Sequence, residues 1–185
     1  MEQNKVIAVQ GVGGGGTRER HRQDFYPTPK DVTFALMDFL KLDHGLKIWE
    51  PACGERDMAD AIEEYGYDVI ATDIEMGHDF LTADAVECDW IITNPPFSIA
   101  DEFIRKCKSM NKPFAMLLKS QYWHASKRST LFAEATPSWV LPLTWRPDFL
   151  FKQQEKGRPL MDVMWCVWIP PYNSTTQYIP LLRKR

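Results

Sequence analysis

Short apolar runs alternate with amphipathic segments along most of this 185-residue chain. Apolar residues at helical spacing predict helices over residues 31–42, 57–65, 100–110 and 126–135. Apolar runs predict strands over residues 47–50, 67–73, 90–93, 113–118, 138–143 and 162–169, with a short further strand at 80–82. Strands that alternate with helices indicate an α/β fold with a mostly parallel sheet covered on both faces.

The first 23 residues depart from this pattern. Gly11–Gly16 matches the letters of the dinucleotide fingerprint G-x-G-x-x-G, a motif that requires an apolar-faced helix directly behind it. Residues 17–24 are charged or polar and carry no apolar stripe, which argues against a nicotinamide oxidoreductase built on this run. We therefore interpret residues 1–23 as a flexible, glycine-rich basic arm and residues 24–185 as one domain.

Composition excludes several classes of protein. Hydrophobic residues make up 44% and charged residues 25%, as in ordinary globular domains. No apolar run reaches membrane-helix length and the polar start lacks a signal-peptide core, so we expect a cytoplasmic protein. The four cysteines form no C-x-x-C pair and the four histidines show no ligand spacing, so neither a metal site nor a disulfide framework is expected.

The charge is unevenly distributed. Residues 38–104 hold 17 acidic and 3 basic residues, whereas residues 105–158 hold 11 basic and 3 acidic ones. Such asymmetry favours one face suited to a polyanion, and solvated helix faces of opposite sign are the alternative. Aromatic residues are interleaved with the basic ones in the second half. The candidate phosphate contacts are Lys119, Lys127, Arg128, Arg146, Lys152, Lys156 and Arg158.

Asn94-Pro95-Pro96-Phe97 follows the apolar run at 90–93. Two prolines cannot continue a sheet, so the chain must turn at the carboxyl end of a buried strand, where open α/β sheets place ligands. The loop offers a side-chain amide, proline-flanked carbonyls and an aromatic ring. Those groups suit an exocyclic amino group on a flat ring. A proline turn with a core phenylalanine is the simpler interpretation.

Two further motifs precede this loop. Glu50-Pro51-Ala52-Cys53-Gly54 joins the first predicted strand to a helix, and its glycine allows a ligand to approach the backbone. Asp73 ends the second strand, 19 residues after Gly54, where an acidic side chain can accept from ribose hydroxyls. Further upstream, the prolines of Phe25-Tyr26-Pro27-Thr28-Pro29 hold an extended backbone just before an amphipathic segment.

With these three motifs in this order, the chain resembles the S-adenosylmethionine-dependent amino methyltransferases that carry an N/D-P-P-Y/F motif. It resembles more closely the small phage-type DNA N6-adenine methyltransferases, from about residue 24 to 104 and more weakly to 168. The resemblance implies a Rossmann-like class I methyltransferase fold with a doubly wound sheet and a late antiparallel strand. It also implies S-adenosylmethionine as cofactor and double-stranded DNA as partner, with the target adenine flipped out.

The resemblance also implies roles for residues. Asn94 and the carbonyl of Pro95 would accept hydrogen bonds from the adenine amino group, beside Pro96, and Phe97 would stack on the base. The cofactor pocket would be formed by Tyr26, Thr28, Glu50, Pro51, Ala52, Cys53, Gly54, Asp73, Ile74, Asp79 and Phe80. Family members usually have a second glycine where this chain has Arg56, so Arg56 either turns outward or lowers cofactor affinity.

Three other functions stay open at this stage. Amino methyltransferases with NPP motifs also act on amino groups of RNA adenine or guanine and on protein glutamine. The basic second half argues weakly against glutamine. A catalytically degenerate, nucleic-acid-binding protein with this fold is the third, because of Arg56. The sequence does not indicate an oligomeric state.

Overall fold

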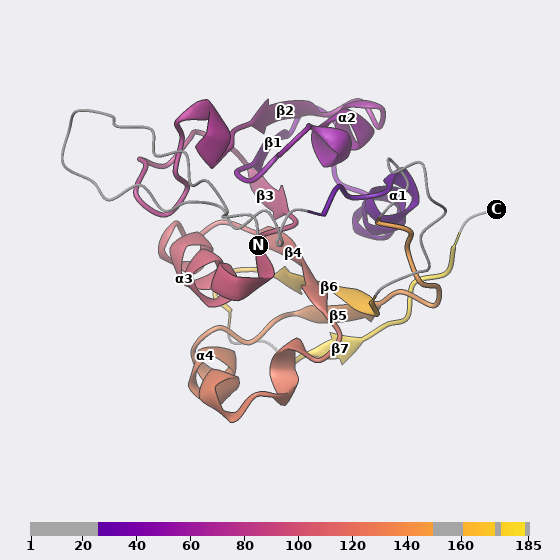
Figure 1. Ribbon diagram of the computed structural model, residues 1–185, viewed down its shortest axis with the longest axis vertical. Coiled ribbons are helices and arrows are strands. Elements are labelled where there is room, and N and C mark those ends of the chain that lie inside the picture. Colours follow the sequence, from indigo (N-terminus) through magenta and orange to yellow (C-terminus); the bar gives the residue numbers. More distant parts are fainter. Residues whose placement is uncertain (1–25, 150–160, 173–174, 184–185) are drawn as a thin grey trace, which may run out of the picture.

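The computed structural model describes residues 26–149, 161–172 and 175–183. Within these residues, seven strands form one sheet in the order β2-β1-β3-β4-β6-β5-β7 (Figure 1). The strands are β1 (Lys47–Glu50), β2 (Asp68–Ala71), β3 (Trp90–Thr93), β4 (Phe114–Lys119), β5 (Trp139–Pro142), β6 (Val163–Trp168) and β7 (Gln177–Tyr178). Strands β2, β1, β3 and β4 are parallel neighbours, and β6 runs antiparallel to both β4 and β5. The predicted fold class, with its late antiparallel strand, is confirmed.

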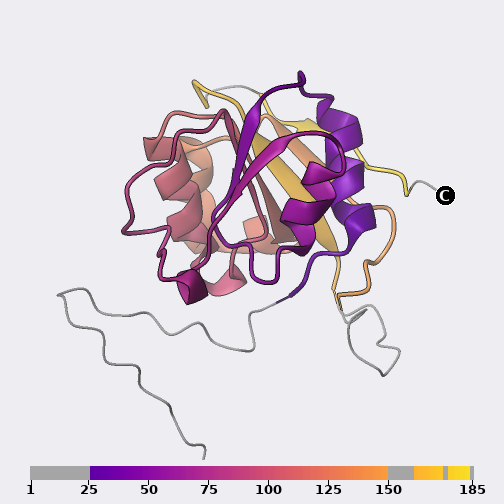
Figure 2. The ribbon, with the colours of Figure 1, turned by 90° about the horizontal axis from the view of Figure 1, so that it is seen from above.

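Helices cover both faces of this sheet. They are α1 (Lys30–Leu40), α2 (Asp57–Glu63), α3 (Ala100–Ser109) and α4 (Ser129–Glu134). Figure 2 shows α1 and α2 on one side of the sheet and α3 with α4 on the other. Neighbouring strand residues therefore enter different cores. Trp49 belongs to the same core cluster as Phe103 of α3, whereas Ile48 belongs to the cluster that contains Leu36 of α1. Burial on both faces explains why β3 and β4 read as continuous apolar runs.

Two local predictions were wrong. Residues 80–82 form turns instead of a strand, because the side chain and carbonyl of Asp79 accept the amides that a ladder would need. The predicted helix at 126–135 is divided into a 3₁₀ turn, Ser126–Arg128, and α4. Strand β7 was not predicted. It is exposed and pairs in parallel with β5, so no alternation of buried residues marks it in the sequence.

Some predictions lie outside the described residues. These are the glycine-rich arm at residues 1–23 with Phe25, and the basic residues Lys152, Lys156 and Arg158.

Candidate active site

Four polar side chains lie at one edge of the sheet. Glu50 ends β1, Asp73 follows β2, Asn94 follows β3 and Lys119 ends β4. The four strands are parallel neighbours, so their carboxyl ends meet at the same edge. This is the edge at which open α/β sheets bind ligands.

The side-chain amide of Asn94 is held in one orientation. Its Nδ2 donates to the backbone carbonyl of Tyr26 and to Oγ1 of Thr28, both at 3.1 Å. The carbonyl can only accept, so the amide nitrogen must face Tyr26. The other amide atom, Oδ1, is buried and has no hydrogen-bond partner among the described residues. The N-terminal Tyr26–Thr28 stretch thus fixes an unused acceptor at the carboxyl end of β3.

Aromatic rings surround this loop. The Phe97 ring lies 5.8 Å from the Tyr26 ring with an interplanar angle of 33°, and Tyr26 meets the edge of Phe149 at 6.0 Å. The ammonium of Lys119 lies 4.8 Å from the centre of the Phe97 ring. Phe149 comes from the segment after β5 and was not predicted as part of the site. In the sequence it begins the apolar triplet Phe149-Leu150-Phe151, which carries no signal of its own for this site.

A small pocket opens beside the same loop. It has a volume of about 370 Å³ and is lined by Phe97, Ser98, Lys119, Gln121, Tyr122 and Arg128. A more open depression of about 610 Å³ adjoins it at Arg128, lined by residues of the 3₁₀ turns and α4. Gln121 and Ser98 were not predicted as site residues.

The loop after β1 is joined to the end of β2. Gly54 has a positive φ of 51°, and its amide donates to Oδ2 of Asp73 at 2.8 Å. The second oxygen of Asp73 accepts the amide of Glu75 at 3.0 Å. Asp73 is 1% exposed, so it clamps two backbone turns together. A carboxylate has about four acceptor positions, and the ribose-binding role stays a prediction.

Glu50 is buried beside this clamp. It is 2% exposed, and its Oε2 has no hydrogen-bond partner among the described residues. Burial raises the pKa of Glu50 to about 8; the Ala59 backbone and Arg56 oppose the rise, while Asp73 and Asp57 add to it. The carboxyl group is therefore largely neutral at neutral pH.

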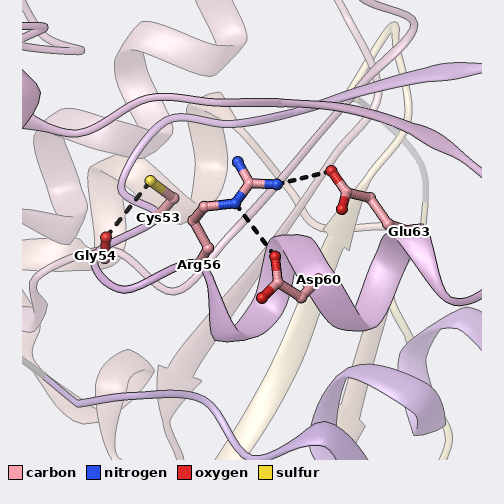
Figure 3. A network of polar contacts seen from close by, with 5 residues as sticks. All are labelled: Cys53, Gly54, Arg56, Asp60 and Glu63. Atoms are coloured by element: carbon pink, nitrogen blue, oxygen red, sulfur yellow. Dashed lines mark hydrogen bonds and ion pairs between the residues drawn. The ribbon is translucent and has the colours of Figure 1, made fainter.

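Arg56 turns outward. Its guanidinium donates to Asp60 at 3.2 Å and to Glu63 at 2.8 Å, both on α2 (Figure 3). Its backbone is left-handed, with φ 70° and ψ 9°. Glycine, the residue that the resembling methyltransferases usually have at this position, adopts this conformation without strain. The backbone turn is therefore the same, although the residue carries a side chain. Of the two possibilities that the sequence left open, the outward orientation is the one observed.

Two other predicted cofactor residues, Asp79 and Phe80, follow β2 in the chain. Phe80 is 2% exposed and packs on Trp49 at 5.1 Å and on Phe103 at 4.7 Å. Asp79 caps the turn that follows it, because its Oδ1 accepts the backbone amide of Leu81. Phe80 is thus part of the core, and its predicted contact with the cofactor stays a prediction.

Cysteine and metal chemistry receive no support within the described residues. Burial raises the pKa of Cys53 to about 11, so this thiol stays protonated at neutral pH. Cys88, Cys107 and Cys166 are likewise free and buried. In the described ranges, no group of three His, Cys, Asp or Glu side chains is arranged to hold a metal ion. None of the helices described there combines the length and apolarity of a membrane span.

The candidate phosphate contacts fall into different environments. Lys127 is exposed on a 3₁₀ turn, and Arg146 is exposed and paired with Asp162 at 2.8 Å. Arg128 is not a free surface cation. Its side chain is 17% exposed, and it donates to Asp101 at 2.9 Å and to the carbonyl of Tyr122 at 2.8 Å. The sequence pattern alone does not separate these cases.

No protein-family model matches this chain, and no curated protein matches it. Solved structures do. A putative class I S-adenosylmethionine-dependent methyltransferase from Listeria monocytogenes is 16% identical with a TM-score of 0.53, and the match covers 82% of this chain and 65% of that one. This chain has the class I methyltransferase fold.

Two further neighbours share this fold. A modification subunit of a putative type I restriction enzyme from Vibrio vulnificus YJ016 is 12% identical, has a TM-score of 0.54, and is matched over 86% of this chain and 47% of its own. A putative hemolysin from Lactococcus lactis is 9% identical with a TM-score of 0.58, over 84% and 93%. The present chain thus spans about two thirds or less of the first two neighbours. At these identities the likeness establishes the fold, and the reaction has to be argued from the site.

Proposed function

We propose that this protein transfers a methyl group from S-adenosylmethionine to the N6 amino group of adenine in DNA. The observation that carries the proposal is the fixed and buried Oδ1 of Asn94, which has no hydrogen-bond partner in the part of the chain that the structure describes. A buried acceptor without a partner is unfavourable, and it persists where a ligand supplies the missing donor. An exocyclic amino group supplies such a donor.

The chemistry follows from two acceptors at one nitrogen. The lone pair of an adenine amino group is delocalised into the ring, which makes the nitrogen a poor nucleophile. Asn94 Oδ1 and the Pro95 carbonyl each accept one N–H hydrogen bond. This favours a pyramidal nitrogen whose lone pair is no longer delocalised into the ring and can act as a nucleophile. Phe97 stacks on the base and holds it in this position. Oδ1 is preorganised for this role because Tyr26 and Thr28 already fix the amide.

The residues at the ends of β1 and β2 fit the cofactor. S-adenosylmethionine supplies a methyl group already activated by a positively charged sulfur. Its methionine part carries an ammonium group, whose positive charge would favour the ionised form of the buried Glu50 carboxyl; Oε2 of Glu50 has no hydrogen-bond partner among the described residues. The positive φ of Gly54 is compatible with a ligand close to the backbone, and Asp73, which accepts the Gly54 amide, is the proposed partner of the ribose hydroxyls. Tyr26 and Thr28, which the resemblance also places in the cofactor pocket, accept hydrogen bonds from the Asn94 amide.

Two observations favour DNA as the substrate in this proposal. One neighbour in fold is described as a modification subunit of a restriction enzyme, and the basic second half of the chain suits a polyanion. RNA amino groups present the same chemistry and are the main alternative. A base within a duplex must leave the stack before it reaches Asn94.

Replacement of Asn94 by alanine tests the mechanism. It removes the acceptor at the reacting nitrogen, so we expect turnover to fall by ~10²–10³ while S-adenosylmethionine affinity stays within a few-fold of wild type. Thermal unfolding and cofactor calorimetry of the variant serve as controls for folding. Wild-type turnover in Asn94→Ala would exclude this mechanism.

The substrate is tested with labelled S-adenosylmethionine. The purified protein is incubated separately with DNA, RNA and a cellular protein extract, each is digested, and the labelled product is identified by mass spectrometry. We expect N6-methyldeoxyadenosine from DNA. Label in RNA or in glutamine, with none in DNA, would overturn the DNA assignment and leave the methyltransferase assignment intact.

A further inference from the structure

Lys119 differs from the other cations around the candidate site. It ends β4, directly beside β3 and the Asn94 loop. It forms no ion pair with any described residue, and its ammonium rests over the Phe97 ring at 4.8 Å. Arg128 lines the same pocket, but Asp101 and the carbonyl of Tyr122 already accept its hydrogen bonds. Lys119 is thus the cation of this pocket whose charge is not matched by a carboxylate.

The position of Lys119 conflicts with stacking on Phe97. The ammonium covers one face of the ring that is proposed to receive the target base. A base that stacks on that face displaces the ammonium and ends its contact with the ring. The displaced ammonium then needs another partner. The pocket beside it, lined in part by the hydroxyl-bearing Ser98 and the exposed Gln121, has room for one.

We propose that this pocket binds the phosphate group adjoining the target base, with Lys119 as its cationic ligand. The inference rests on the proposed function, because it assumes that Phe97 receives a base, and it narrows the substrate to a phosphorylated nucleotide unit. A nucleotide brings its own anion and compensates the displaced ammonium. A glutamine side chain or a free nucleoside brings none. Lys119 thereby favours nucleic acid over protein at the same amino-methylating site.

The smallest probes that separate base from phosphate are deoxyadenosine and its 5′- and 3′-monophosphates. Each is titrated against the whole protein, and binding is followed by NMR, which detects weak affinities. We expect at least one monophosphate to bind about fivefold or more tightly than deoxyadenosine. We expect Lys119→Gln to abolish this preference and Lys119→Arg to retain it.

Lys47→Gln is the matched control, because Lys47 is exposed and basic but lies at the start of β1 and does not line this pocket. It should keep the full preference for the monophosphate. Equal binding of nucleoside and monophosphates by the wild type, or a preference that survives in Lys119→Gln, would overturn the assignment of Lys119. Unchanged S-adenosylmethionine affinity in Lys119→Gln checks that the fold at the sheet edge is intact.

Failure here and failure of the proposed function are distinguishable. A monophosphate preference that depends on Lys119, in a protein that methylates no DNA, leaves the phosphate site in place and removes the DNA adenine assignment. Methylation of DNA adenine without any such preference removes the phosphate site alone. The binding measurements need neither methyl transfer nor a known recognition sequence.

Discussion

Arg56 occupies a backbone conformation that residues with a side chain avoid. Its φ of 70° places it in the left-handed region, where a β-carbon adds roughly 1–2 kcal/mol. The two ion pairs that it forms with Asp60 and Glu63 are largely exposed and offset this only in part. Arg56 is therefore a locally unfavourable residue at a position where glycine would be relaxed.

Two substitutions at position 56 separate backbone from side chain. Arg56→Ala and Arg56→Gly both remove the ion pairs, but only glycine relaxes the left-handed backbone. We expect Arg56→Gly to be more stable than Arg56→Ala by about 1 kcal/mol in chemical denaturation. Cofactor affinity should be similar in both variants, because the guanidinium points along α2. A large loss of affinity in both would instead indicate a direct contact with the cofactor.

Glu50 predicts a pH dependence of stability. Burial raises its folded-state pKa from the usual 4.5 to about 8, so the folded protein holds a proton that the unfolded chain releases. The associated stability is complete below about pH 4.5 and is lost as the pH rises toward 8. The free energy of unfolding is measured against pH for the wild type and for Glu50→Gln. Between pH 4.5 and 8 the wild-type value should decline relative to that of the variant, and above pH 8 the two profiles should be parallel. Parallel profiles over the whole range would contradict the buried neutral state.

At the scale of elements, one polar cluster joins α3 to the turns after β4. Asp101, in the first turn of α3, accepts from the Tyr122 hydroxyl at 2.6 Å and from Arg128 at 2.9 Å. Arg128 also lies over the Tyr122 ring at 4.1 Å. Burial alone would raise the pKa of Asp101, but these two hydrogen bonds prevail and lower it. Since α3 begins directly after Phe97–Ile99, the cluster positions the turns after β4 relative to the Asn94 loop.

The neighbouring cations Lys127 and Arg128 should therefore behave differently. Arg128→Ala breaks a half-buried charge pair, and we expect a loss of roughly 1–2 kcal/mol of stability with little change in the salt dependence of DNA binding. Lys127→Ala should leave stability within ~0.5 kcal/mol and reduce the slope of log affinity against log salt by about 1. Chemical denaturation and DNA titrations at several salt concentrations check both. If both variants reduced the slope of log affinity against log salt by the same amount, Arg128 would also contact phosphate.

At the scale of the whole molecule, the sheet order separates the charges. The acidic segment, residues 38–104, contributes β2, β1 and β3, whereas the basic segment begins in α3 and continues through β4 and α4. Strands β2 and β1 lie at one end of the sheet, and β5 and β7 lie at the other (Figure 1). The asymmetry along the sequence thus becomes an asymmetry across the sheet. A polyanion is accordingly expected to approach over β4 and the turns that follow it, where Lys119 and Lys127 lie.

The sequence by itself determined the parts of this protein that depend on local patterns. Buried strands read as apolar runs, and Glu50 and Asn94 were placed correctly at or just after strand ends because a proline follows each of them; Asp73 was placed just after β2 because it is the first charged residue behind an apolar run. Segments without such a pattern were missed: β7 is too short and exposed, and residues 80–82 turn because Asp79 takes the backbone amides.

Only the tertiary structure decided which side chains are available. The sequence gives Lys119, Lys127 and Arg128 the same charge, but contacts with residues remote in the chain fix Arg128 and leave Lys119 over Phe97. The orientation of Asn94 likewise depends on Tyr26 and Thr28, which lie more than 60 residues away in the sequence. Hydrogen bonds and ion pairs are short-range, so they form according to proximity in the fold, which spacing along the chain does not encode.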